Sequence, residues 1–307
     1  MSQAFKGLHW SREINIKRYL MPRTLSEALE LLAEHDGTAQ VIAGGTDVIP
    51  HLRHGSLHVE TLVDISLLPG LNTISQEADN IVFGGLVTHS QVADSSLIRE
   101  HAAAFAEAAE SVGSPQIRNI ATIGGNLANG HPAADTAMPL LALDASVTVA
   151  SHEGDREIPL SEFFHGVGKT AVNPRKEILR KIQFAIPKDN EGNSFLRLSK
   201  RGSLTIAVMI LSAVVEADKK GNVIKNARIA LGPVAAVPLR ASKTEETLRN
   251  APITLETIER AAESVCKESN PLSDPVWGSA AYKEVLVRTF TKRGLTRALK
   301  QIGINLN

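Results

Sequence analysis

Two pairs of adjacent glycines constrain this chain more than any other feature. The stretch TIGGNLANGHPAAD, residues 122–135, places Gly124 and Gly125 between two apolar runs. An earlier stretch, VIAGGTD at residues 41–47, has the same character. Glycine lets the backbone approach a ligand closely, and successive N–H groups in such a turn can surround a phosphate. Two such loops suit the two phosphates of one dinucleotide.

Asp135, at the end of the second stretch, adds an acceptor that can hydrogen-bond sugar hydroxyls or cap the helix expected after it. Neither stretch has the G-x-G-x-x-G pattern that opens a Rossmann βαβ unit, so a dinucleotide would bind on a different fold. Residues 166–170, GVGKT, are similar to the end of a P-loop. Phe163 occupies the position of the required first glycine, which excludes a Walker-type NTPase.

The composition excludes several classes of partner. The 307 residues suit two domains, the first of them divided, and Lys+Arg equals Asp+Glu at 33 each. We therefore expect no nucleic-acid partner and no membrane-surface partner. The longest apolar run, residues 204–215, is too short to cross a bilayer, and the N-terminus lacks the apolar core of a signal peptide. The sequence predicts a cytoplasmic protein without membrane insertion.

No metal site or catalytic constellation is predicted. Cys266 is the single cysteine, so an electron-handling role would need an organic cofactor. His51, His54 and His58 have helical spacing, but Pro50 and Gly55 argue against a regular helix there. The Thr-His-Ser run at residues 88–90 is better explained as a helix cap than as a nucleophile and base. We assign no catalytic residue.

Hydrophobic periodicity, caps and turn residues predict the order of the elements. A capping box at residues 24–27 opens a helix that stops at Gly37, and a second box at residues 88–91 opens a helical stretch to Val112, in one or two pieces. The charged residues 188–193 form the domain boundary. Strands are expected at 14–16, 40–43, 61–65, 80–86, 146–151, 156–158, 177–187, 195–199, 208–217 and 223–231, and later helices at 135–143, 243–250, 254–266 and 279–299. The second part, strands followed by helices, has an α+β order.

Four longer stretches are similar to one known family. They are AGGTD at residues 43–47, QIRNIATIGGNLANGHPAAD at 116–135, FFHGVGKTAVNPRKEILRKIQFAIP at 163–187 and ARIALGPVAAVPLRA at 227–241. They span nearly the whole chain in the right order. The chain thus resembles the FAD-binding medium subunit of the molybdenum hydroxylases, of the carbon monoxide dehydrogenase and xanthine dehydrogenase type.

The resemblance implies an α+β fold with non-covalent FAD. A PCMH-type FAD-binding domain would span residues 10–188, with subdomains of roughly 10–65 and 66–188. A small α+β domain of the carbon monoxide dehydrogenase flavoprotein type would follow at 194–300. The positions that match the family's cofactor-binding residues are Val41, Ile42, Ala43, Gly44, Gly45, Thr46, Asp47, Val48, Thr122, Ile123, Gly124, Gly125, Asn126, Asp135, Leu179, Phe195 and Arg197.

The resemblance also implies individual roles. Both glycine stretches would contact the FAD diphosphate and its neighbourhood, and Asp135 would bind sugar or ribityl hydroxyls. Leu179 would touch the cofactor, and Phe195 would lie near the isoalloxazine. Arg197 stands where the family has a lysine at the flavin carbonyl edge, and Thr205 stands where an aspartate is common. These two departures point to a different electron acceptor.

In such a complex this chain would relay electrons. It would take them from [2Fe-2S] clusters of an iron-sulfur small subunit, fed by a molybdopterin large subunit, and pass them to an acceptor such as NAD or quinone. The assembly implied is a heterohexamer, a dimer of heterotrimers. Two alternatives stay open: a free-standing flavoenzyme with Ser90, Ser203 or His131 as proton donor, and a non-redox assembly module that has lost its cofactor. The substrate of the molybdenum site stays open as well.

Overall fold

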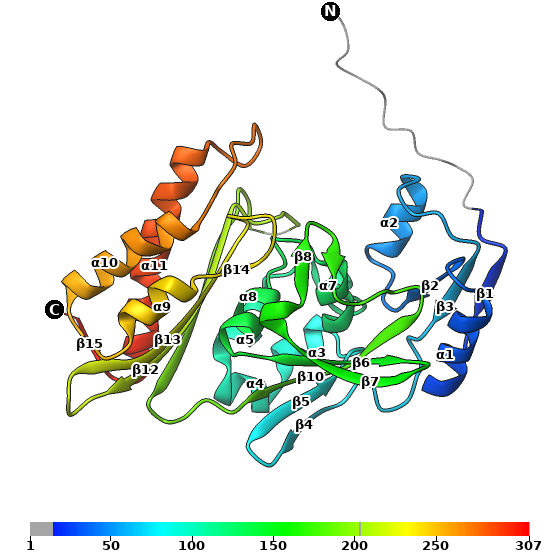
Figure 1. Cartoon of the computed structure of the whole chain (residues 1–307), viewed down its shortest axis with the longest axis horizontal. Coiled ribbons are helices and arrows are strands. Elements are labelled where there is room, and N and C mark those ends of the chain that lie inside the picture. The colour runs from blue at the N-terminus through cyan, green and yellow to red at the C-terminus, as the bar shows by residue number, and fades with distance from the viewer. Residues whose placement is uncertain (1–14, 203, 307) are drawn as a thin grey trace, which may run out of the picture.

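The computed structural model describes residues 15–202 and 204–306, and they form three layers of sheet along the long axis of the molecule (Figure 1). The first sheet is small and parallel. Its strand order is β1 (Arg18–Leu20), β3 (Thr61–Asp64), β2 (Ala39–Ile42). Helix α1 (Leu25–Glu34) connects β1 to β2, and a short helix, α2 (Val48–Arg53), follows β2. Thr24 caps α1 by accepting a hydrogen bond from the Glu27 N–H, as its sequence predicts.

The second sheet is antiparallel and five-stranded. Its order is β4 (Ile74–Glu77), β5 (Asn80–Gly84), β10 (Glu177–Ala185), β6 (Ser146–Ser151), β7 (Gly154–Pro159). Its helices are α3 (His89–Asp94), α4 (Ser96–His101), α5 (Ala103–Glu110), α6 (Pro115–Arg118), α7 (Ile123–Asn129) and α8 (Ala137–Ala142), followed by the 3-10 turn η1 (Leu160–Glu162). A hairpin of β8 (Phe164–Gly166) and β9 (Lys169–Thr170) precedes β10.

Three phenylalanines form the centre of the core beneath the second sheet. Phe83, Phe105 and Phe184 have ring centroids 5.6 to 6.4 Å apart, and each is nearly inaccessible to solvent. The same core includes Phe195 and Ile210 from the third sheet. Burial of these apolar side chains therefore joins the second and third layers as well as stabilising each one.

The third sheet runs β11 (Glu191–Leu198), β12 (Met209–Asp218), β13 (Val223–Gly232), β14 (Leu239–Arg240), with β15 (Ala251–Pro252) also paired to β13. Helices α9 (Ser242–Leu248), α10 (Leu255–Glu268) and α11 (Ala280–Gln301) cover its outer face (Figure 1). Side chains alternate along β11. Leu196 and Leu198 pack with those helices, whereas Phe195 joins the core on the opposite face.

Polar contacts fix the third layer on the second. Arg240 binds Asp144, Glu245 and the Leu141 carbonyl oxygen, and Arg297 binds Glu107. Gly232 has no room for a side chain, because a Cβ there would lie 2.3 Å from the Pro132 carbonyl oxygen. The two parts of the chain therefore form one closely packed body.

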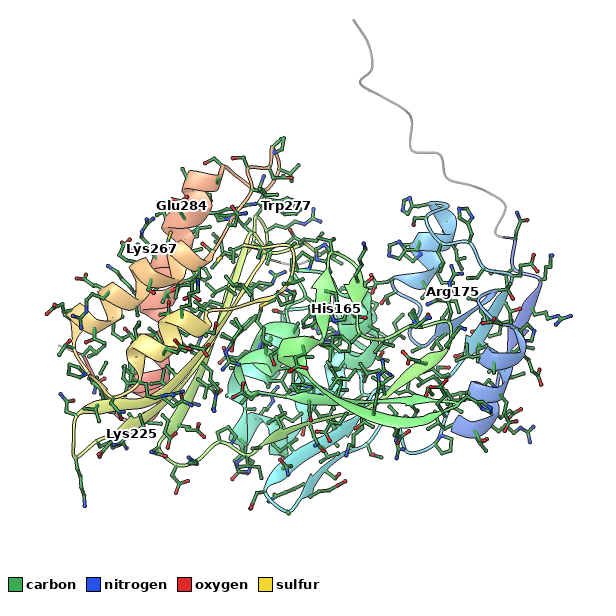
Figure 2. The ribbon with its side chains drawn as sticks, in the orientation of Figure 1. His165, Arg175, Lys225, Lys267, Trp277 and Glu284 are labelled. Carbon is green, nitrogen blue, oxygen red and sulfur yellow. The ribbon has the colours of Figure 1, made fainter. Side chains whose placement is uncertain are left out.

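Arg175 attaches the first sheet in the same way. This residue (Figure 2) precedes β10 and donates hydrogen bonds to the carbonyl oxygens of Gly37 and His58. The Val41 N–H donates to the Pro174 carbonyl oxygen at 2.9 Å. Strand β2, which leads to the first glycine pair, is thus held against the second sheet.

Several elements differ from the sequence-based prediction. Strand β1 lies at Arg18–Leu20, whereas a strand was predicted at residues 14–16. Asn15 and Ile16 are not in a strand, and Ile14 lies outside the described residues. The stretch at 88–112 is broken into α3, α4 and α5, more pieces than expected. Pro50 lies in the first turn of α2, where its missing N–H costs no helical bond, so a short helix forms there that was not expected. It ends at Arg53 and Gly55 has φ +67°, so no regular helix carries the three histidines, as predicted. Strands β4, β8, β9, β14 and β15 were not predicted. No helix in the described part is long and apolar enough to cross a membrane.

We expect Arg240→Ala to lower the free energy of unfolding by about 2–4 kcal/mol, because it leaves the mostly buried Glu245 carboxylate without its cation and removes the hydrogen bonds to Asp144 and the Leu141 carbonyl oxygen. The matched control is Arg260→Ala, which removes an exposed pair with Glu256 within α10 and should change the stability by less than about 0.5 kcal/mol. Urea unfolding measures both. Equal effects of the two substitutions would contradict the role given to Arg240.

Candidate functional site

The first glycine pair forms a loop between β2 and α2, and its conformation depends on both glycines. A Cβ at Gly44 would lie 1.9 Å from the Ile120 carbonyl oxygen, so only glycine permits this contact between loop and backbone. Gly45 has φ +70°, which L side chains rarely adopt. Within the described residues, no group accepts a hydrogen bond from the backbone N–H groups of residues 44–48. The loop therefore presents a row of unpaired donors.

The second glycine pair is helical. Gly124 and Gly125 lie in the first turn of α7, which Thr122 caps by accepting from the Gly125 N–H at 3.0 Å. The N–H groups of Ile123 and Gly124 donate to the carbonyl oxygens of Val87 and Gly85. These N–H groups therefore already have acceptors within the protein, and their contact with a phosphate stays a prediction.

Close packing explains why glycine stands at position 124. A Cβ there would lie 2.4 Å from the Gly85 carbonyl oxygen, so the absent side chain lets α7 pack against the segment after β5. Gly125, the next residue, is exposed. Leu179 belongs to the same contact region. A Cβ added at Gly85 would lie 2.0 Å from the Leu179 carbonyl oxygen. Helix α7, the segment after β5 and strand β10 are thus joined through backbone contacts.

Asn126 has a fixed orientation. Its Oδ1 accepts a hydrogen bond from the Thr136 hydroxyl at 2.8 Å, which leaves the amide Nδ2 on the other side of the group. In the described part of the chain no group accepts from that Nδ2. Asn126 therefore offers an oriented donor beside the exposed Gly125.

Asp135 pairs with Arg197 instead of capping α8, whose N-cap is Thr136. The Arg197 Nε donates to Asp135 Oδ1 at 2.8 Å, and the Arg197 Nη2 donates to the Thr205 carbonyl oxygen at 2.6 Å. Both side chains are about one-tenth exposed. Burial raises the pKa of Asp135 to about 6, although Arg197 opposes the rise through its charge and its hydrogen bond. This ion pair connects the second layer to β11.

Asp47 and His131 approach one another from different layers. Their charges act on one another, but the two side chains form neither a hydrogen bond nor an ion pair. Burial raises the pKa of the Asp47 carboxyl, opposed by His51 and His131, and lowers the pKa of the His131 imidazole, opposed by Asp47. Asp47 is nevertheless solvent-accessible. Asp47 at the first glycine loop and His131 after α7 are therefore near one another, and solvent reaches both.

The remaining predicted residues are mostly buried. Phe195 is 5 % exposed and packs in the core shared by the second and third layers, on the same strand face as Arg197. Ile42 and Leu179 are buried, while Val41, Ala43, Thr46 and Val48 are half-buried. The predicted residues thus lie where the layers meet. Only a few of their side chains, such as Asn126, Asp135 and Arg197, make polar contacts.

The alternative sites receive little support. Ser90 donates its hydroxyl hydrogen to Asn119 Oδ1 at 2.6 Å, and Ser203 lies outside the described residues. His51 is bound to Ser56, and the described residues contain no group of three or more metal-ligating side chains placed to hold an ion. The P-loop-like residues 166–170 form the tip of the β8–β9 hairpin.

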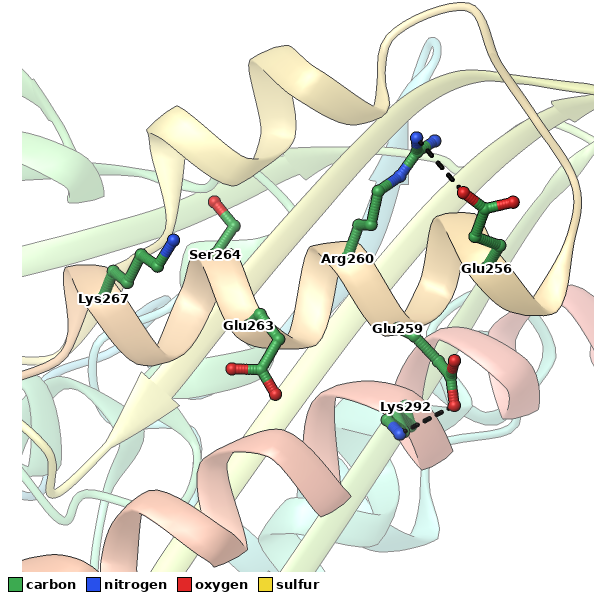
Figure 3. Close-up of a pocket in the computed structure, with 7 residues that line it drawn as sticks. All are labelled: Glu256, Glu259, Arg260, Glu263, Ser264, Lys267 and Lys292. Atoms are coloured by element: carbon green, nitrogen blue, oxygen red, sulfur yellow. Dashed lines mark hydrogen bonds and ion pairs between the residues drawn. The ribbon is translucent and has the colours of Figure 1, made fainter.

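A hollow of about 520 Å³ lies between α10 and α11, on the outer face of the third sheet (Figure 3). Glu259 pairs with Lys292 and Glu256 pairs with Arg260, so its charges neutralise one another. The other lining residues are Glu263, Ser264 and Lys267. We interpret it as a solvated helix surface, because it contains no unpaired buried group and lies away from the junction of the layers.

Comparison with known proteins gives two family matches. Residues 12–188 match the FAD binding domain in molybdopterin dehydrogenase, and residues 194–298 match the CO dehydrogenase flavoprotein C-terminal domain. The chain is 34 % identical over 288 residues to the xanthine dehydrogenase FAD-binding subunit of Escherichia coli O157:H7, covering 93 % of this chain and 97 % of that one. It is 29 % identical over 281 residues to the carbon monoxide dehydrogenase medium chain of Hydrogenophaga pseudoflava, covering 91 % and 96 %.

The fold agrees with a solved structure. Carbon monoxide dehydrogenase from Hydrogenophaga pseudoflava which lacks the Mo-pyranopterin moiety of the molybdenum cofactor superimposes with a TM-score of 0.88 at 28 % identity, covering 93 % of this chain and 98 % of that one. The predicted fold class, a two-subdomain FAD-binding domain followed by a small α+β domain, is therefore confirmed.

We expect Gly44→Ala to lower the free energy of unfolding by about 2 kcal/mol or more, because the new methyl group would overlap the Ile120 carbonyl and displace the loop. Gly202→Ala is the control, since a Cβ at Gly202 meets nothing within 4 Å. Its stability should remain within about 0.5 kcal/mol of the parent. Denaturant titration of both variants measures the difference, and an unchanged Gly44→Ala protein would refute the packing role.

The pKa of Asp135 gives a pH prediction with a definite sign. A carboxyl whose pKa is raised on folding stabilises the folded state at low pH, and this contribution is lost as the pH rises through about 6. Relative to Asp135→Asn, the parent should therefore lose roughly 2–3 kcal/mol of stability between pH 4 and pH 7, since one pKa unit equals about 1.4 kcal/mol. Unfolding free energies of the two proteins at several pH values test this. A difference that is constant with pH would contradict it.

Proposed function

Because this chain belongs to the family of FAD-binding subunits of molybdopterin dehydrogenases, we propose that it relays electrons within a molybdenum hydroxylase. It takes them from [2Fe-2S] clusters of a partner subunit and passes them to an external acceptor such as NAD or quinone. Bound FAD can exchange electrons singly or in pairs, which suits a junction between one-electron clusters and a two-electron acceptor.

The row of unpaired N–H donors at residues 44–48 is the observation that carries this proposal. Backbone donors without protein acceptors suit an anionic group such as the FAD diphosphate. The Asn126 amide provides a further donor. These residues fit FAD, and we propose that it binds between the first glycine loop and residues 122–135.

The residues around this position have distinct proposed tasks. The Oδ2 of Asp135 accepts from sugar or ribityl hydroxyls, while Arg197 occupies Oδ1 and keeps that carboxylate oriented. Arg197 also places a positive charge on the face of β11 that carries Phe195, which suits the carbonyl edge of an isoalloxazine. The remaining predicted residues, 41–48, 122–125 and Leu179, supply the surrounding wall. The buried Phe195 supports that wall from behind.

The proposed partners follow from what this chain lacks. Its single cysteine cannot hold a [2Fe-2S] cluster, so the clusters belong on an iron-sulfur small subunit and the molybdopterin on a large subunit. We propose a dimer of such heterotrimers in the cytoplasm. We propose domain limits of 10–188 and 194–300; strand β11 begins at Glu191, within the segment between these limits, and leads into the second domain.

Purification of the tagged chain from its own cells should yield a complex that contains FAD, iron and molybdenum. The complex, but not the isolated chain, should oxidise a member of a panel of purines, N-heterocycles and aldehydes. When the acceptor is withheld, the substrate should bleach the flavin absorbance of the complex. The isolated chain should show flavin without iron. Full substrate turnover by the isolated chain, or a colourless complex, would contradict the relay.

A further inference from the structure

His131 is held in a defined tautomer by its own turn. It follows Gly130, the left-handed residue that ends α7, and its Nδ1 accepts a hydrogen bond from the Ala133 N–H at 3.1 Å. A neutral imidazole that accepts at Nδ1 carries its proton on Nε2. Across the described ranges, 15–202 and 204–306, no group accepts from that Nε2–H. His131 therefore presents a single oriented donor.

This donor lies near the first glycine loop. The carboxylate acting electrostatically on His131 is that of Asp47, at the end of the first glycine loop, yet the two groups make no direct bond. Helix α2 follows Asp47 in the chain, and helix α8 follows His131. In Figure 1 these two helices lie in different parts of the fold, with α7 between them. His131 therefore lies near the loop that carries the N–H groups of residues 44–48.

Near the first glycine loop and α7, the polar groups without an acceptor in the described part of the chain are donors. They are the N–H groups of residues 44–48, the Asn126 Nδ2 and the His131 Nε2. The carboxylate whose charge acts on His131 is that of Asp47. A donor set of this kind favours a phosphate group over a neutral or cationic one.

We infer that His131 is a cofactor-binding residue whose Nε2–H donates a hydrogen bond to the diphosphate of FAD, opposite the N–H groups of residues 44–48. The inference rests on the proposed FAD function and adds a contact to it. His131 was considered from the sequence only as a proton donor for a free-standing enzyme. The contact with Ala133 explains its orientation, and the missing acceptor at Nε2 indicates its task.

Two substitutions separate this role from a purely structural one. His131→Asn retains an oxygen that can accept from the Ala133 N–H, as asparagine does in Asx turns, but its amide is too short to replace Nε2. His131→Gln places an amide N–H near the position of Nε2 and weakens the turn. If His131 only orders the turn, asparagine preserves FAD binding better than glutamine does. If it contacts the diphosphate, the order is reversed.

The test uses the full chain in its purified complex, freed of flavin and titrated with FAD by fluorescence quenching and with ADP by competition. We expect His131→Asn to weaken the binding of both FAD and ADP about tenfold or more, because a hydrogen bond to a charged group is lost. His131→Gln should stay within about threefold of the parent, and His152→Asn, in the exposed β6–β7 turn, should match it.

The outcomes distinguish this inference from the proposed function. If the parent complex rebinds FAD and His131→Asn binds it equally well, the inference is wrong while the proposed function stands. Tighter binding by His131→Asn than by His131→Gln also overturns it and leaves His131 as a turn residue. If the parent complex rebinds no FAD, the proposed function fails, and this contact fails with it.

Discussion

The close approach of backbone to backbone at Gly44 and Gly124 is the constraint on which the site depends. At Gly44 the loop after β2 lies against Ile120, and at Gly124 helix α7 lies against Gly85. Any side chain at either position would separate these segments by the width of a methyl group or more. The first glycine loop therefore lies beside the residues that lead into α7, and its N–H groups at residues 44–48 have no acceptor among the described residues. Glycine acts here chiefly through packing, and only the first pair also exposes donors.

Donors and ion pairs are divided between two sides of the proposed cofactor position. Donors without protein acceptors come from the first glycine loop, Asn126 and His131. The charged pair of Asp135 and Arg197 lies where the third sheet meets the second layer. A dinucleotide has the same division, with a charged diphosphate and hydroxyl-bearing sugars. Arg240, Gly232 and the shared phenylalanine core keep the layers close enough for both groups of residues to act on one ligand.

Much of the fold could be predicted from local signals, and the failures have physical causes. The caps at Thr24 and Thr88 and the apolar strands of the third sheet were found because their patterns are local. Strand β4 was missed because its sequence, ISQE, is polar, and α7 was missed because adjacent glycines disfavour helix. In the site, the pairing of Asp135 with Arg197 joins residues 62 positions apart, and no spacing rule predicts it. The tautomer of His131 likewise depends on the Ala133 N–H.

Hydrogen–deuterium exchange of the complex with and without FAD tests the central claim most directly. The N–H groups of residues 44–48 lack acceptors in the described part of the chain, so they should exchange quickly without FAD and slow strongly when it binds. The N–H groups of Ile123 and Gly124, already bonded to Val87 and Gly85, should change far less. Protection confined to other segments, such as α10 and α11, with no change at residues 44–48, would contradict the placement of the cofactor.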